Sequence, residues 1–178
     1  MRSLNWQKKL GRDGHRVKFS GRPVAMHCHH YNINLQKTLE DTLGEQGVQL
    51  VYRSSEEAIL EDFKSILGQY DSIKSDKSKF EMAGLMFQNS GMGIIRVEAL
   101  GPDGGLFVSP SNHHVTGWLA KHGRRPTPGC HFVRGWIAGI LEAIYDRTVG
   151  YYTVEEQECK MVRDGDCVFV VKVAQYGD

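Results

Sequence analysis

The sequence lacks two features that would each define a protein class: a long apolar run and an excess of charge of one sign. It contains no run of about 18 apolar residues, so it predicts no membrane-spanning helix. Lys and Arg number 22 against 21 Asp and Glu, which removes the electrostatic argument for a nucleic-acid-binding protein. We therefore expect no membrane and no nucleic acid among its partners.

The N-terminus also lacks an export signal. Residues 1–23 are basic and polar, without the apolar core or small-residue cleavage site of a secretory signal, so we expect a cytoplasmic protein. In that reducing compartment the four cysteines are expected to be thiols or metal ligands rather than two disulfides. The basic residues predict a solvated N-terminal arm, residues 1–22, followed by one domain of residues 23–178.

Apolar residues with helical spacing predict a helix over residues 32–43. Its apolar face has one leucine every four residues, and Gly44 and Gly47 are expected to end the helix; the leucines are Leu35, Leu39 and Leu43. A second helix is expected to begin at a cap on Ser54 or Ser55 and to end near Gly68. Residues 77–88 keep helical spacing and predict a third helix.

The second half of the chain changes to strand patterns around one strong helix. A hairpin is expected over residues 94–108, turning at Gly101–Gly105, and a short helix with a loop over 109–128. A helix over 130–147 carries Gly135 and Gly139 one turn apart, where another backbone can approach closely. A last hairpin over 151–173 is expected to turn at residues 163–165. The order predicts one α+β domain with an antiparallel sheet of hairpins packed with helices.

Three of the four cysteines lie in this last third. With a three-residue turn, residues 161 and 167 face each other, which places Cys159 diagonal to Cys167 on one face. A strand that returns along the helix brings Cys159 level with Cys130 at the helix start. The three thiols are either metal ligands or buried small hydrophobic side chains.

Glu156 is the candidate fourth ligand. It lies three residues from Cys159, so in a regular strand the two side chains would point to opposite faces. A bulge or a strong local twist is needed to bring them together; otherwise water, Glu155 or a histidine would complete the site. Three thiolates and a carboxylate favour zinc in a closed structural site, because no position remains open for a substrate.

The same residues carry a family resemblance. The run Cys130–Gly139, followed by Val154, Glu156-x-x-Cys159 and the run Gly165–Phe169, resembles the 4-vinyl-reductase-like (hydrocarbon-binding) domain. That domain occurs in the sensor domains of phenol-responsive transcription activators. The resemblance covers about 50 residues and implies an α+β fold, frequent dimerisation and a buried pocket for a small apolar or aromatic molecule. It also implies zinc bound by Cys130, Glu156, Cys159 and Cys167.

In the phenol sensors a His and a Trp hold the ligand hydroxyl. The candidates for such ligand contacts here are His113, His114, Trp118 and Tyr31. The 178 residues carry neither the ATPase nor the DNA-binding region of those activators, so we expect no regulation by a fused effector.

A histidine group near residue 30 has no counterpart in the resemblance. On a helix, His27 shares a face with His30 and with Tyr31, and two histidines at such spacing can bind one metal. His113 or His114 could supply a third ligand, which would give an open catalytic site for a second transition metal. The alternatives are a hydrogen-bonded helix cap and ligand contacts without metal.

Two functions lead, and a third, a scaffold or assembly subunit, rests on fold-level analogy alone. The first is a homodimeric module that binds or senses a small apolar or aromatic molecule and holds a structural zinc. The second is a metalloenzyme that uses the histidines, with His27, His30, Tyr31, His113 and His114 as the candidate catalytic residues.

Overall fold

The computed structural model describes residues 10–19, 21–25 and 27–174. Three short strands come first: β1 (Leu10–Asp13), β2 (Arg16–Phe19) and β3 (Arg22–Val24). Three helices follow: α1 (His29–Leu43), α2 (Glu45–Leu67) and α3 (Asp76–Asn89). The rest consists of β4 (Gly93–Gly101), β5 (Gly104–Asn112), α4 (His113–His122), α5 (His131–Ile144), β6 (Tyr152–Glu158) and β7 (Cys167–Val173).

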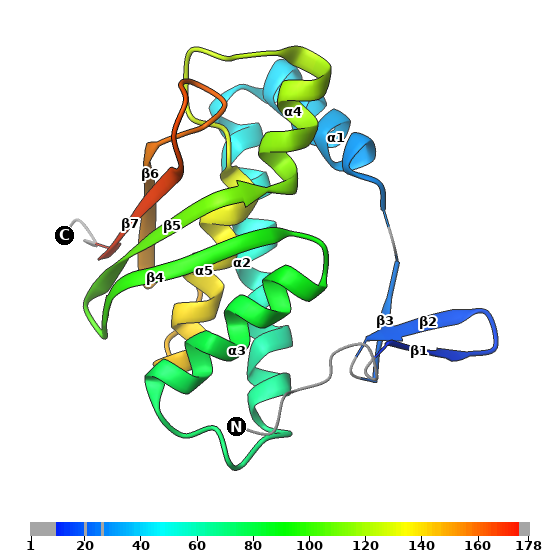
Figure 1. Cartoon of the computed structure of the whole chain (residues 1–178), viewed down its shortest axis with the longest axis vertical. Coiled ribbons are helices and arrows are strands. Elements are labelled where there is room, and N and C mark those ends of the chain that lie inside the picture. The colour runs from blue at the N-terminus through cyan, green and yellow to red at the C-terminus, as the bar shows by residue number, and fades with distance from the viewer. Residues whose placement is uncertain (1–9, 20, 26, 175–178) are drawn as a thin grey trace.

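The main sheet is antiparallel with strand order β4-β5-β7-β6. Helix α5 lies behind it and packs against α2, while α3 covers the end of the molecule near β4 (Figure 1). The predicted α+β fold with an antiparallel sheet of hairpins is confirmed. Because α5 has a neighbour on every side, 12 of its 14 residues are buried.

Two glycines let α5 approach α2 closely. A Cβ built at Gly139 would lie 2.5 Å from the carbonyl oxygen of Glu56, and one at Gly135 would overlap the carbonyl oxygen of Tyr52. The predicted role of these glycines is confirmed, and the partner backbone is that of α2. This contact fixes the helix that begins directly after Cys130.

The start of α2 was predicted wrongly. The chain bends at Gly44, whose φ of 57° suits glycine, and α2 begins directly after it at Glu45. Gly47 does not end a helix, because it lies inside α2 and its missing side chain lets the backbone of Leu39 approach. Ser55 is no helix cap either, since its hydroxyl donates to the carbonyl oxygen of Phe132 at 2.9 Å.

The leucine face of α1 points to solvent. The buried residues of this helix are Ile33 and Gln36, whereas Leu35 is 48% and Leu43 is 40% exposed. Helical periodicity placed the leucines correctly on one face, but it could not tell which face packs against the domain.

Both predicted hairpins are present. The first turns at Pro102–Asp103, between the paired Gly101 and Gly104. The second has a longer connection than expected, residues 159–166, and pairs Glu158 with Val168 instead of residue 161 with residue 167. The segment after the first hairpin continues β5 to Asn112 and then forms α4, the predicted short helix.

Strands β1–β3 form a small sheet that stands apart from the rest of the molecule (Figure 1). It includes the described part of the basic arm, and most of its residues are exposed. Phe19 packs against the core, and Arg22 is paired with Asp62 of α2 at 2.8 Å.

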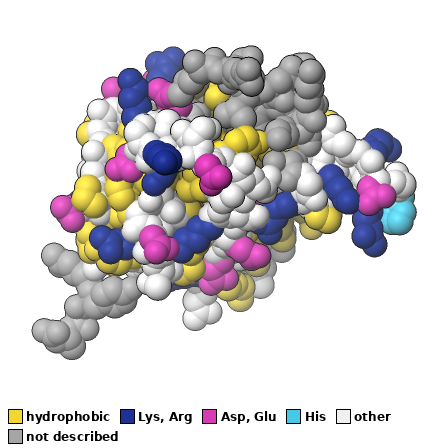
Figure 2. All heavy atoms as spheres, turned by 90° about the horizontal axis from the view of Figure 1, so that it is seen from below, with side chains coloured by type: hydrophobic (Ala, Val, Ile, Leu, Met, Phe, Trp, Pro, Cys, Tyr) yellow, Lys and Arg dark blue, Asp and Glu magenta, His cyan; other side chains and the backbone are white. Residues whose placement is uncertain are grey.

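Basic and acidic side chains are interspersed over the face seen in Figure 2, which agrees with the nearly balanced charge. None of the helices in the described ranges is both long and apolar enough to cross a membrane.

Candidate functional site

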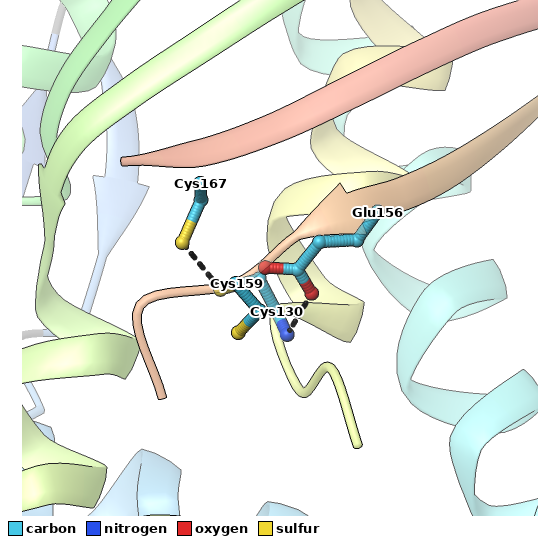
Figure 3. A group of neighbouring side chains, drawn as sticks. All are labelled: Cys130, Glu156, Cys159 and Cys167. Atoms are coloured by element: carbon cyan, nitrogen blue, oxygen red, sulfur yellow. Dashed lines mark hydrogen bonds between the residues drawn. The ribbon is translucent and has the colours of Figure 1, made fainter. Parts of the chain in front are cut away.

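Four side chains from three elements converge at one end of the sheet (Figure 3). Cys130 precedes the first turn of α5, Glu156 lies on β6, Cys159 directly follows β6, and Cys167 begins β7. One potential ligand atom from each residue lies within 4.8 Å of the others. The three cysteines are buried, with exposures of at most 3%.

An irregularity in β6 brings Glu156 to this site. The pairing of β6 with β7 shifts between Glu156 and Glu158, so Glu156 and Cys159 reach the same side. The sequence indicated that such a bulge was required, and the structure contains it.

Backbone and side-chain groups hold the ligand atoms in place. One carboxylate oxygen of Glu156, Oε2, accepts a hydrogen bond from the amide of Cys130 at 2.9 Å. The Sγ of Cys167 accepts from the amide of Lys160 at 3.3 Å, and the amide nitrogen of Asn112 lies 3.7 Å from the Sγ of Cys130. These contacts hold the side chains of Glu156, Cys167 and Cys130 in place.

The geometry and chemistry of the four residues fit zinc. Two sulfurs bound at about 2.3 Å to a tetrahedral zinc are about 3.8 Å apart, and the Sγ atoms of Cys130 and Cys167 are 3.7 Å apart. The second oxygen of Glu156, Oε1, is buried and has no protein hydrogen-bond partner. A cation would satisfy this oxygen and complete a donor set of three sulfurs and one oxygen.

Without a cation the four groups oppose one another electrostatically. Burial raises the pKa of the Cys130 thiol, and burial together with the charge of Cys159 raises the pKa of Glu156 to about 8. Hydrogen bonds from Cys130 and Cys167 lower the pKa of Cys159. The cluster therefore favours one thiolate beside neutral neighbours, and a divalent cation would allow all four to ionise.

A partly buried ion pair supports the loop that leads to Cys130. Arg125 contacts both carboxylate oxygens of Glu40 on α1, at 3.2 and 2.9 Å. Burial alone would raise the pKa of Glu40, but hydrogen bonds from His131 and Arg125 outweigh it and hold the pKa at about 2. Gln36 donates to Glu40 and to the carbonyl oxygen of Gly129. Helix α1 thus holds Gly129, which directly precedes the candidate ligand Cys130.

A second candidate site is an apolar groove of about 930 Å³ between α3 and the edge strand β4. Phe80 and Leu85 line it from α3, Ile95 and Leu100 from β4, and Tyr145 closes one end. Arg96 and Glu98 add charged groups to its lining. Sequence patterns gave no signal for this groove, because its walls are ordinary apolar residues from separate elements.

The predicted ligand-contact residues lie elsewhere. His113, His114 and Trp118 belong to α4, and Tyr31 is half exposed on α1; none of them lines the groove. The ring of His113 lies 4.0 Å from that of His114, and its Nε2 is 3.2 Å from the side-chain amide of Asn32.

His114 is fully enclosed. Its ring stacks on Phe132 with centroids 5.0 Å apart, and neither ring nitrogen has a partner among the described residues. Burial, with smaller effects from His113 and His131, lowers its pKa well below the usual value. Burial and His29 lower the pKa of His113 to about 4. Both histidines are therefore neutral near pH 7.

The histidines do not assemble into a metal site. In the described ranges, the cysteine and glutamate cluster is the one group of three or more His, Cys, Asp or Glu residues with metal-binding spacing. His27 lies against Tyr31 and His29 against His30, each pair with ring centroids 4.6 Å apart. The second metal site thus remains a prediction without a matching geometry.

A buried pair of carboxyl groups was not foreseen from the sequence. Glu56 of α2 and Glu142 of α5 are both fully buried. Burial and the neighbouring Glu56 raise the pKa of Glu142 to about 8, so Glu142 favours its protonated form near neutral pH, while Glu56 pairs with Arg53 at 2.8 Å. The amides of Gly150 and Tyr151 donate to them at 2.9 and 3.0 Å. Glu56 and Glu142 thus join the loop after α5 to helices α2 and α5.

Comparisons with solved structures identify the fold. The phenol-responsive sensory domain of the transcription activator PoxR, solved with phenol, superposes with a TM-score of 0.81 at 18% identity, covering 95% of this chain and 87% of that one. A trafficking protein particle complex subunit 3 from Naegleria fowleri, covalently bound to palmitic acid, gives a TM-score of 0.56 at 14% identity, over 83% and 96% of the two chains.

A vinyl-4-reductase family protein from Methanocaldococcus jannaschii gives a TM-score of 0.44 at 19% identity, over 82% and 92% of the two chains. No protein-family model matches the chain, and no curated protein matches its sequence. The expected resemblance to the sensor domains of phenol-responsive activators is confirmed at the level of the fold.

Proposed function

We propose that this chain is a module that binds a small apolar or aromatic molecule in the groove between α3 and β4. The observation that carries the proposal is the groove itself, whose volume of about 930 Å³ lies within the range of about 300 to 1,000 Å³ common for small-molecule sites. The fold shared with a domain solved with phenol supports the same ligand class.

The lining of the groove suits a ligand with one polar group. Apolar side chains supply most of its surface, so burial of each ligand methylene contributes about 0.8 kcal/mol. Burial raises the pKa of the Tyr145 hydroxyl to about 12, so it stays protonated and can donate a hydrogen bond. Arg96 also lines the groove and can donate a hydrogen bond to a ligand oxygen. This assigns ligand contacts to Tyr145 and Arg96 instead of the histidines of α4.

Calorimetric titration with phenol and with octanol tests the groove. The variant Leu85→Arg places a charged side chain in the groove, and we expect at least a tenfold loss of affinity for the probe that binds the wild type. Leu10→Arg is the matched control, because Leu10 is similarly exposed but lies on the small sheet. Equal affinity of both variants and wild type, or no binding of either probe, would contradict the proposal.

The cysteine and glutamate cluster is proposed to hold a structural zinc. When bound, zinc would offset half of the negative charge of the four ionised ligands and join the start of α5 to the β6–β7 connection. Its support is the 3.7 Å separation of two sulfurs and the unpartnered oxygen of Glu156. Cytoplasmic residence is proposed with it, since four cysteines without a disulfide suit a reducing compartment. No observation favours the metalloenzyme alternative.

The division into an arm of residues 1–22 and a ligand-binding domain of residues 23–178 is retained as a proposal. Its support is that the small sheet has few buried side chains of its own.

A homodimer is the proposed assembly, and the leucine face of α1 is its proposed interface. Tyr31, Leu35 and Leu43 are exposed along this face, and the charges of α1 lie on other sides. Lys37 and Asp41 pair with each other, and Glu40 points inward to Arg125. An evenly spaced neutral stripe can pack against its own copy about a two-fold axis.

Light scattering after size exclusion tests this interface. Leu35→Asp should convert a dimer to a monomer, whereas the control Lys37→Asp should not, because Lys37 lies on the opposite side of α1. A dimer that survives Leu35→Asp would exclude this face as the contact.

A further inference from the structure

A chain of hydrogen bonds joins the groove to the cysteine cluster. It begins at Ile94 of β4, which lines the groove and is 41% exposed. The hydroxyl of Ser109 on β5 donates to the carbonyl oxygen of Ile94 at 2.8 Å. Ser109 is 1% exposed, so the side chain of a buried residue on β5 bonds to the backbone of the groove wall.

Asn112 continues the chain to the first metal ligand. Its amide nitrogen donates to the hydroxyl of Ser109 at 3.4 Å and to the Sγ of Cys130 at 3.7 Å. Its side-chain oxygen accepts from the amide of Val115 at 3.0 Å and so caps α4. The side chain is 1% exposed, and all of its identified partners are protein groups.

A helix cap alone does not require this residue. Serine or aspartate would cap α4 equally well. The amide of Asn112 does both with separate atoms, since Oδ1 accepts from the helix while Nδ2 donates to the sulfur; aspartate has no donor, and serine has one oxygen for both tasks. The second partner, Cys130, explains why the capping residue has a donor group.

The wall of the groove is the irregular part of the sheet. The pairing of β4 with β5 shifts between Ile94 and Arg96 and again between Val97 and Ala99. Bulged segments leave residues outside the regular ladder. By contrast, β4 is tightly held just before Ile94, since a Cβ at Gly93 would overlap the backbone of Ser111. A ligand in the groove therefore contacts the bulged segment of β4 directly after Gly93, whose backbone is held against Ser111.

We infer that Asn112 is a positioning residue that couples occupancy of the groove to the metal centre. A ligand that shifts β4 at Ile94 changes the position of Ser109 and, through it, the hydrogen bond from Asn112 to Cys130. A donor to a ligating sulfur reduces the electron density that the sulfur gives to the metal. The inference rests on the proposed function and adds to it the route by which binding reaches the cysteine site.

Cobalt-substituted protein tests the coupling, because sulfur-to-cobalt charge-transfer absorption reports the electron donation of the thiolates. Absorption is recorded with and without the probe, phenol or octanol, that binds in calorimetry. In the wild type, saturation with this probe should shift the band. Asn112→Ser retains a capping hydroxyl and removes the amide. It should shift the ligand-free band, abolish the probe-induced shift and keep probe affinity within threefold of wild type.

Ser109→Ala is the second variant and interrupts the chain one step earlier. It should leave the ligand-free band unchanged and still abolish the probe-induced shift. Circular dichroism and a cobalt content of one per chain establish that each variant is folded and loaded. If Asn112→Ser does not fold, Ser109→Ala alone decides the coupling.

The outcomes separate this inference from the proposed function. A probe-induced shift of wild-type size in Asn112→Ser or Ser109→Ala would overturn the coupling while the proposed function stands. A wild-type protein that binds the probe without any band shift would do the same. Failure of calorimetry to detect either probe would overturn the proposed function and the coupling together. An unchanged ligand-free band in Asn112→Ser would overturn the role of Asn112 at the metal in either case.

Discussion

The close approach of α2 and α5 predicts that one added methyl group at Gly139 destabilises the protein. A Cβ at this position would lie 2.5 Å from the carbonyl oxygen of Glu56, 2.9 Å from the amide nitrogen of Leu60 and 3.2 Å from the Cβ of Ile59. Favourable contacts of such atoms begin at about 3.5 Å. The helices would therefore have to separate by about 1 Å.

The expected change in the free energy of unfolding of Gly139→Ala follows from two opposing effects. Alanine is better than glycine in a helix interior by about 1 kcal/mol. Overpacking costs about 1 to 3 kcal/mol and sometimes more, and here two of the three opposing atoms belong to a backbone that cannot rotate away. We expect Gly139→Ala to lower the free energy of unfolding by about 2 kcal/mol. For a domain of this size that corresponds to a Tm lower by about 4 to 8 °C.

Urea denaturation followed by circular dichroism measures this change, with Gly84→Ala as the control. Gly84 also lies within a helix, but the nearest atom to its Cβ position is the carbonyl oxygen of Ile95 at 3.6 Å. That variant should gain about 0.5 to 1 kcal/mol. If Gly139→Ala is as stable as the wild type, or if both variants gain stability, the close packing of α2 and α5 is refuted.

Three further predictions concern buried charge. The raised pKa of Glu142, about 8, means that the folded protein favours the protonated form of this side chain. Stability should therefore be greatest below the pKa of the unfolded state and should fall as pH rises through about 8. The urea midpoint should change less with pH in Glu142→Gln than in the wild type, and an equal pH dependence of the two proteins would refute this. Arg125→Ala removes one of the partners that hold the pKa of the partly buried Glu40 low and should cost about 2 kcal/mol in urea unfolding; a cost below about 0.5 kcal/mol would contradict it. Chelation with EDTA should lower the Tm of the wild type but not that of Cys159→Ser. An equal change of Tm in both proteins would contradict metal binding at the cluster.

The sequence was sufficient for the features that depend on local pattern. The turn residues at Pro102–Asp103 and the spacing of Gly135 and Gly139 predicted a hairpin and a close helix contact, and both are present. The cysteine spacing placed the cluster correctly even though the assumed turn was too short. The expected register was wrong because the connection between β6 and β7 spans residues 159–166, whereas the irregularity between Glu156 and Cys159 was anticipated.

Features that depend on which elements meet could not be read from the chain. The leucines of α1 mark an apolar face, but the packed face is the one with Ile33 and Gln36, since Gln36 reaches Glu40 and Gly129. The groove combines apolar residues of α3, β4 and Tyr145 that carry no motif. Two glutamates far apart in sequence gave no sign that they share a buried site.

The most direct test of the account is the metal content and X-ray absorption spectrum of the purified protein, of Cys159→Ser and of His113→Ala. The account predicts one zinc per chain with three sulfur ligands at about 2.3 Å and one oxygen at about 2.1 Å, retained in His113→Ala and lost in Cys159→Ser. A protein without metal, or a second metal equivalent that is lost with His113, would contradict it.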